Sequence, residues 1–371
     1  MKTRTLFGAV LLTSASFAGY NIGSGFATGI EGQQFFAAYG AKYAYIGMLI
    51  SIVLVALVLA PVYIVGYEQQ FQDDKTIYRY FCGRKLGVAF DAYVYFSLGL
   101  VVLTMMSGAG ATMKQYLGIP EFAGTVLIGT MCILAALLGL EKLIRVLSYI
   151  GVFVIIFIFC CAVYVFFTSG ETPASGAVNV DKYVADGELL PANIFGICNP
   201  VFSAVACAGL LVGSGFPWVS ATGRLCSGYK EAILCGVFSS IVYFGAQGIV
   251  VYLDLTTMDK IAGAEVPMLA VIQHYLPVLS LIYSCIIVLA IFSTVTGRFF
   301  LLASRFDGGS RKKHLVITIS AVVISAAAGS FIPFARISNI MFSISGTVGI
   351  LFCVIILHKF LKTRKGKLVR S

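Results

Sequence analysis

Apolar runs of about twenty residues recur along the whole chain, and they limit its possible folds more than any other feature. An α-helix needs roughly that length to cross the ~30 Å hydrocarbon core of a bilayer. The runs are continuous and lack the alternation of a β-barrel strand, so they predict membrane-spanning helices. The composition agrees, because 59% of the residues are hydrophobic and only 11% are charged. We therefore predict an all-α integral membrane protein that lies in a lipid bilayer.

The apolar runs predict ten spans in two groups of five. The first group occupies 1–168 and the second 191–360, with an extracellular connection at 169–190 and a basic cytoplasmic tail at 361–371. The predicted spans are 6–39, 43–67, 88–116, 121–140, 144–168, 191–222, 229–253, 277–304, 314–334 and 337–360.

Lysine and arginine residues are unevenly distributed between the predicted loops. With the N-terminus in the cytoplasm, 21 of the 26 fall at predicted cytoplasmic ends and loops, among them Lys2, Arg4, Lys142 and Arg145. The excess of cationic residues on the cytoplasmic side places both termini in the cytoplasm. The net charge of +10 therefore indicates orientation in the membrane and not binding to nucleic acid.

No motif in the sequence indicates an enzyme, a cofactor site or an ATP-driven pump. The ten cysteines have no spacing typical of metal ligands, and the three histidines lie at predicted membrane boundaries. The chain also lacks the GxxxxGK[ST] pattern of nucleotide-binding loops. We expect no catalytic residues, and no metal other than a sodium ion.

The first span, 6–39, is unusually long and polar. As one helix it would measure about 50 Å, and its part FAGYNIGSGFATGIEGQQFF contains five glycines and four amide or acidic residues. Gly23, Ser24 and Gly25 have low or modest helix propensity and lie near the middle of the span, so we predict a break there.

A break at membrane depth is tolerated where the unwound backbone faces a cavity or a ligand. It would leave half-helices at about 6–22 and 26–39, whose free N–H and C=O groups suit a carboxylate and a cation. We predict that Asn21, Gly23, Ser24 and Gly25 bind substrate. Close helix packing, to which the four-residue glycine spacing is also suited, is the alternative interpretation.

The sixth span offers two candidates for a second break. Proline removes a backbone donor, so Asn199-Pro200 is the favoured break, with Asn199 binding substrate. An ordinary proline kink is the alternative. The segment 213–216 reads GSGF, as 23–26 does, and we interpret it as a helix end near the cytoplasmic surface.

Three segments resemble a known group of proteins. GSGFATGIEGQQFFAAYG at 23–40, AGAEVPMLAVI at 262–272 and FSTVTGRFF at 292–300 are similar to YkvI-like bacterial membrane proteins. That group is placed in the amino acid–polyamine–organocation transporter superfamily. The resemblance implies a LeuT-like fold in the bacterial cytoplasmic membrane, with a 5+5 inverted repeat, discontinuous helices one and six, and alternating access.

The resemblance also implies a sodium site between the first and eighth helices. Sodium-coupled relatives bind the ion through carbonyls of the first helix and hydroxyls of the eighth helix. In this sequence the corresponding residues are Gly19, Ile22, Ala290, Ser293 and Thr294. Five neutral oxygens suit a weakly held monovalent cation. Proton-coupled relatives can place a lysine of helix five there, and 146–168 has none. The alternative is that the two hydroxyls only link helices.

Glu31 is a carboxylate within the first span, about 12 Å past Gly23. A carboxylate at this depth indicates a gate or a coupling site. A structural ion pair with Lys42 or Arg336 is the alternative. We expect Arg298, in the eighth span, to extend to the cytoplasm. A gate role together with a nearby acidic residue is the alternative.

These features predict a secondary transporter for a small carboxylate-bearing solute, most simply an amino acid, coupled to sodium. Proton coupling is the alternative to sodium. An amino-acid-sensing receptor of the same superfamily is the alternative to transport, although the chain has few of the extra segments that a receptor would use.

Overall fold

The structure is a computed structural model that describes residues 5–71, 74–138, 150–194, 196–308 and 310–368. Within these ranges the regular structure is helical, apart from an isolated bridge between Ile194 and Ile197. The predicted orienting residues Lys2, Arg4, Lys142 and Arg145 lie outside the described residues, as does the start of the predicted span 144–168.

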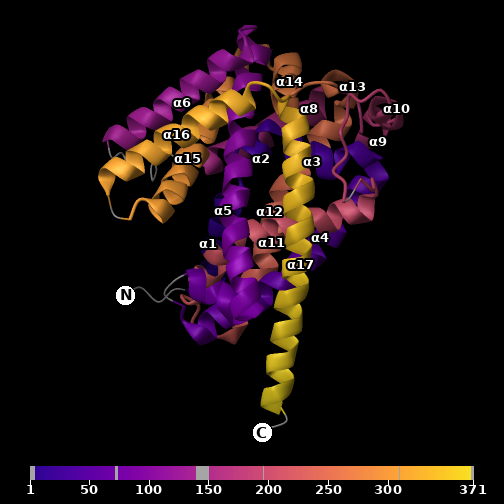
Figure 1. Cartoon of the computed structure of the whole chain (residues 1–371). Helices are drawn as coiled ribbons and strands as arrows, with labels where there is room; N and C mark the ends of the chain where they lie inside the picture. The colour runs from indigo at the N-terminus through magenta and orange to yellow at the C-terminus, as the bar shows by residue number, and fades with distance from the viewer. Residues whose placement is uncertain (1–4, 72–73, 139–149, 195, 309, 369–371) are drawn as a thin grey trace.

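Long helices form a bundle, and most of the short helices lie toward one end of it (Figure 1). The long helices are α1 (Leu6–Asn21), α4 (Gly40–Gln69), α5 (Asp74–Leu117), α6 (Glu121–Leu138), α8 (Ile150–Thr168), α11 (Pro200–Gly223), α12 (Tyr229–Thr256), α15 (Ser280–Phe306), α16 (Arg311–Gly329) and α17 (Phe334–Leu368). The short ones are α2 (Ser24–Thr28), α3 (Ile30–Phe35), η1 (Ala37–Tyr39), α9 (Pro173–Gly176), α10 (Val180–Ala185), α13 (Met258–Ile261), α14 (Pro267–Tyr275) and η2 (Pro277–Leu279).

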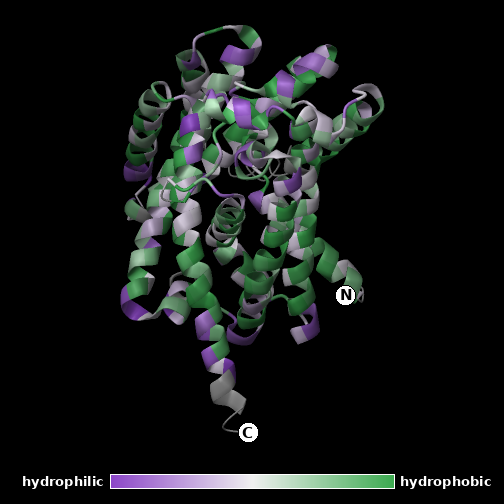
Figure 2. Cartoon of the chain, turned by 90° about the vertical axis from the view of Figure 1, so that its right-hand side faces the viewer, coloured by the Kyte–Doolittle hydropathy of each residue, from purple (hydrophilic) through white to green (hydrophobic). Residues whose placement is uncertain are grey.

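Seven helical segments of the described chain are long and apolar enough to cross a membrane. A bent pair, Phe153–Thr168 with Pro173–Ala185, would make an eighth. Large hydrophobic side chains such as Leu49, Phe96 and Phe166 are exposed on the outside, where lipid would cover them. Figure 2 shows hydrophobic residues along the helices and hydrophilic ones gathered toward the ends of the bundle. The all-helical membrane class is thus confirmed.

The number of crossings and the inverted repeat stay predictions. Two further helices correspond to predicted spans but are shorter than the seven segments: α1 has 16 residues, and the apolar part of α6 is Glu121–Leu137. The first described turn of α1 and the last of α17 lie toward the same end of the bundle (Figure 1). This agrees with an even number of crossings, and it does not assign a side of the membrane to either end.

The predicted break in the first span is present. Helix α1 ends at Asn21, Ile22 and Gly23 are extended, and α2 begins at Ser24. The second half-helix is broken again, because Gly29 has a φ of 83° and separates α2 from α3. A side chain at Gly29 would collide with Met268, whose Cγ lies 2.7 Å from the position of a Cβ. The continuous half-helix predicted over 26–39 is therefore wrong.

Helix α11 differs from its prediction at both positions of interest. It begins at Pro200 and not at 191, because Asn199 caps its first turn and proline is well suited to the first helical position. The segment 213–216 lies inside α11, so its interpretation as a helix end is wrong. The helix continues because it is packed on two sides: Gly209 meets the backbone of Gly346 and Gly349 in α17, and Gly215 faces α1.

One end of the bundle is held together by amide side chains around α3. Gln34 donates from Nε2 to the carbonyl of Ala335 (2.8 Å), and its own carbonyl accepts from the Ala192 N–H (2.8 Å). Asn339 donates to the Gln34 side-chain oxygen (3.2 Å) and to the carbonyl of Pro191 (3.0 Å). The polar character of α3 therefore serves in part to join α17 and the segment before α11 to the broken first span.

Candidate functional site

A cavity of about 240 Å³ opens beside the break between α1 and α2. Its volume lies just below the range of about 300–1,000 Å³ for small-molecule sites. Helices α1, α2, α3, α5, α11, α12, α15 and α17 contribute to its wall. Four predicted residues, Asn21, Gly23, Gly25 and Glu31, line it, and so does the predicted ion ligand Thr294. Residues distant in the sequence thus meet at the unwound segment.

The break leaves backbone groups of the first span without helical partners. The carbonyl of Ala18 accepts from the Ile22 N–H (2.7 Å), and that of Phe17 accepts from the Asn21 side chain (3.0 Å). The carbonyls that follow, including those of Gly19 and Ile22, belong to the helix end that lacks intrahelical donors. At this depth such groups are satisfied by water, an ion or a bound solute.

The two GSGF segments lie against each other. Ser214, in the second copy, donates to the side-chain oxygen of Asn21, which precedes the first copy (3.1 Å). A Cβ on Gly215 would lie 2.9 Å from the ring of Phe17, so glycine permits this close approach. Pro217 cannot donate to the carbonyl of Gly213, and Gly213 lines the cavity. The position where α11 lacks this backbone hydrogen bond therefore faces the break in the first span.

Glu31 and Arg298 bring opposite charges to the same cavity. Glu31 is 7% exposed, and its Oε1 accepts a hydrogen bond from the hydroxyl of Tyr243 (2.5 Å). Its described partner is therefore Tyr243 and not Lys42 or Arg336, the partners considered from the sequence. Arg298 lines the cavity, and its expected extension toward the cytoplasm stays a prediction. Among the described residues, no carboxylate forms an ion pair with its guanidinium.

The predicted ion ligands come from two helices: Gly19 and Ile22 from the end of α1, and Ala290, Ser293 and Thr294 from α15. The Thr294 hydroxyl is 3.5 Å from where a Cβ would stand on Gly23, so α15 touches the unwound segment. Thr294 donates to the carbonyl of Ala290 (2.9 Å), which leaves its oxygen lone pairs available. Ser293 is half-buried on the same helix.

Asn199 lies apart from the other predicted site residues. Its side-chain oxygen accepts from the N–H groups of Val201 (2.9 Å) and Phe202 (3.4 Å), as a helix cap does. It lines a different cavity, of about 630 Å³, with Tyr39 and Asp181. The side chain of Ser24 is outside the described residues.

Among the polar residues of the cavity wall, sequence reasoning did not single out Ser214 or Tyr243, and it gave Arg298 a gate role only as an alternative. Two of them had a usable signal. Ser214 belongs to the repeated GSGF segment, and Arg298 follows Thr294 by four residues, which places both on one face of a helix. Tyr243 had none, because a tyrosine in an apolar span is ordinary.

No protein-family model matches the chain. It is 24% identical to the membrane protein YkvI of Bacillus subtilis over 350 residues, which cover 94% of the chain and 96% of YkvI. It is 22% identical to the B. subtilis protein YyaD over 342 residues, 91% of the chain and 92% of YyaD.

Solved structures of a manganese transporter from Eremococcus coleocola resemble it in fold. A mutant of that transporter, with one histidine replaced by alanine, gives a TM-score of 0.54 at 18% identity, covering 96% of this chain and 80% of the transporter. A complex with an aromatic bis-isothiourea compound gives 0.52 at 15% identity, covering 95% and 78%. The chain is therefore a homologue of the membrane protein YkvI, with a fold that is also found in membrane transporters.

Proposed function

We propose that this protein is a secondary transporter for a small zwitterionic solute, most simply an amino acid, and that it works by alternating access. The observation that carries the proposal is the cavity at the α1–α2 break, which holds one acidic and one basic side chain. A fold shared with solved transporters supports the transport part of the proposal.

The charges of the cavity favour a zwitterion. Arg298 presents a planar group that can bind a carboxylate through two hydrogen bonds. Glu31 can pair with an ammonium group. The start of α2 contributes little to carboxylate binding, because a helix of five residues sums few peptide dipoles. This role therefore shifts from the predicted half-helix to Arg298.

A divalent metal is the second candidate solute, since the solved neighbours are described as manganese transporters. Mn²⁺ prefers carboxylate, carbonyl and water oxygens. The cavity offers such oxygens from Glu31 and Asn21, and it also contains Arg298, which repels a cation. This repulsion makes the zwitterion the better candidate.

We propose sodium as the coupling ion, bound between the carbonyls of Gly19, Ile22 and Ala290 and the hydroxyls of Ser293 and Thr294. The contact of Thr294 with Gly23 supports this placement. Neutral oxygen ligands would bind sodium weakly enough for release on the other side of the membrane.

Uptake into proteoliposomes tests the proposal. Under an inward sodium gradient, we expect accumulation of at least one labelled amino acid, and strongly reduced accumulation by Arg298→Gln. Arg311→Gln is the control, because that arginine lies on the surface and donates to the carbonyl of Leu137. Binding without uptake would favour a receptor. Uptake of Mn²⁺ with no response to any amino acid would overturn the proposed solute.

A further inference from the structure

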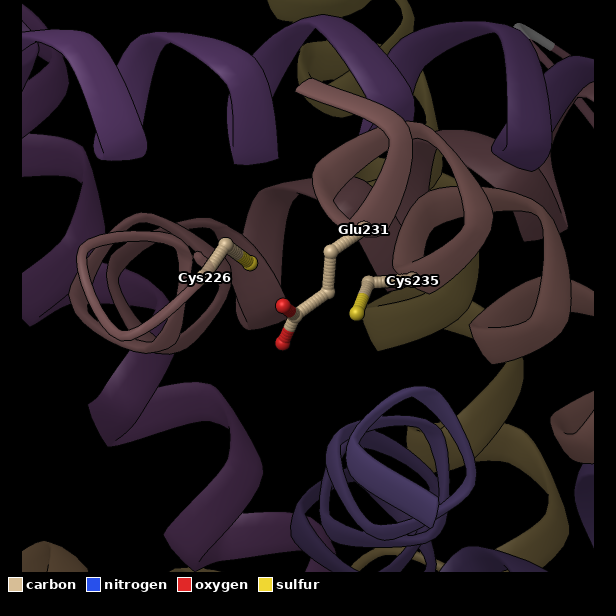
Figure 3. Close-up of side chains that lie close together, drawn as sticks. All are labelled: Cys226, Glu231 and Cys235. Carbon is tan, nitrogen blue, oxygen red and sulfur yellow. The ribbon is translucent and has the colours of Figure 1, made fainter. Parts of the chain in front are cut away.

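Two thiols and a carboxylate meet where the turn after α11 leads into α12. Cys226 lies in that turn, and Glu231 and Cys235 lie in the first two turns of α12, four residues apart on one face. The sulfur atoms and a carboxylate oxygen all lie within 4.8 Å of one another. Figure 3 shows the three side chains pointing toward a common point.

The group is buried. Cys226 and Glu231 are each 7% exposed, and Cys235 is 0% exposed. One Glu231 oxygen accepts from the Ser227 N–H (2.9 Å), which orients the carboxylate toward the thiols. Thr13 of α1 lies near Cys235, where α1 packs against α12. Three separate segments of the chain therefore meet at this point.

Packing and capping explain only part of this arrangement. The hydrogen bond from Ser227 accounts for one carboxylate oxygen, and cysteine is a common small core residue. The start of α12 also favours an acidic residue, but a charged carboxylate at this burial is compensated best by a cation, and no lysine or arginine of the described residues forms an ion pair with Glu231. A metal ion would supply the missing positive charge.

We propose that Cys226, Glu231 and Cys235 form a binding site for Zn²⁺. Two thiolates and a carboxylate are typical zinc ligands, whereas Mn²⁺ prefers oxygen ligands alone. Binding would release the thiol protons, and the fourth tetrahedral position would hold water. The ion would tie the first half of the broken span to α12, at a place separate from the cavity residues described above.

Metal titration of the purified, reduced protein in detergent tests the site directly. Co²⁺ serves as the probe, because thiolate ligands give cobalt a charge-transfer absorption that Zn²⁺ then abolishes by displacement. We expect one equivalent of each metal and a higher melting temperature with Zn²⁺, since a ligand that binds the native state stabilises it.

Variants assign the ligands. Cys226→Ser and Cys235→Ser should each weaken the cobalt absorption, and together they should abolish it. Glu231→Gln keeps an acceptor for Ser227 and should still weaken metal binding about tenfold. Cys161→Ser is the matched control, because Cys161 is a buried cysteine on another helix, 2% exposed.

Two results would overturn the site. One is a cobalt spectrum without thiolate absorption, or one that survives in the double cysteine variant. The other is a Cys226–Cys235 disulfide in the protein as purified, before reduction, that Zn²⁺ does not prevent. Such a disulfide would make the pair a redox element. Neither result depends on solute transport, so the proposed function stands or falls separately.

Discussion

At the scale of single residues, the candidate site depends on a few polar side chains placed in apolar surroundings. Glu31 is the most demanding, because a buried carboxylate needs partners. The described partner is the hydroxyl of Tyr243, in α12. This pair links α3 to α12 and fixes the acidic group beside the break.

Removing the Tyr243 hydroxyl should destabilise the protein through Glu31. We expect Tyr243→Phe and Glu31→Gln to show a coupling free energy of about 0.5–3 kcal/mol in a double-mutant cycle. Tyr63→Phe is the matched control: Tyr63 is also buried, and its hydroxyl bonds to Ser239 (3.2 Å) and should not couple to Glu31. The measurement is unfolding of the purified protein, and additive effects of the first two changes would contradict the pairing.

Thr294 tests the sodium site at the same scale. Thr294→Val keeps the shape and removes one proposed ligand oxygen, so half-saturation by sodium should rise about ten- to hundred-fold, the equivalent of about 1.5–3 kcal/mol. Thr112→Val is the control, because the Thr112 hydroxyl makes a similar bond to a carbonyl four residues earlier, that of Gly108 (2.7 Å). Sodium titration of solute uptake provides the measurement. An unchanged response in Thr294→Val would remove this residue from the site.

At the scale of elements, the contact between α1 and α11 joins the two GSGF segments. Ser214 bonds to Asn21, and Gly215 permits the ring of Phe17 to approach. The break after α1 thus lies beside the part of α11 in which Pro217 removes a backbone hydrogen bond. We expect these two segments to change conformation together, as the proposed alternating access would require.

Alanine substitutions at Gly215 and Gly213 should separate the effect of packing on stability from the effect of helix propensity. Gly215→Ala places a Cβ 2.9 Å from Phe17, so overpacking should cost about 1–3 kcal/mol relative to Gly213→Ala. At Gly213 the nearest atom lies at 3.8 Å, so alanine there gains helix propensity of up to about 1 kcal/mol. Chemical unfolding of both variants gives the comparison. Equal stabilities would show that the two segments do not pack as described.

Sequence patterns predicted some elements and not others, for physical reasons. The break at Gly23 was predictable because glycine and polar residues interrupt an otherwise apolar run. The continuity of α11 through Gly213 was not, because it depends on packing of Gly209 and Gly215 against other helices. The cavity position of Arg298 likewise depends on which face of α15 its neighbours cover.

At the scale of the whole molecule, the helices of the bundle surround one unwound segment near its middle. Amide side chains around Gln34 hold α3, α17 and the segment before α11 together. Any motion that separates α3 from α17 must break these bonds. We therefore expect solute binding and release to involve movement of α2 and α3 relative to α17.

The central claim is that the unwound segment at Gly23 binds the solute. Equilibrium binding of a labelled amino acid to purified Gly23→Leu and Gly23→Ala tests it most directly. Alanine meets only ordinary contact at 3.5 Å, so Gly23→Ala should bind as the native protein does. Leucine would fill the cavity, and Gly23→Leu should lose binding while keeping its melting temperature. Native affinity in a folded Gly23→Leu variant would contradict the account.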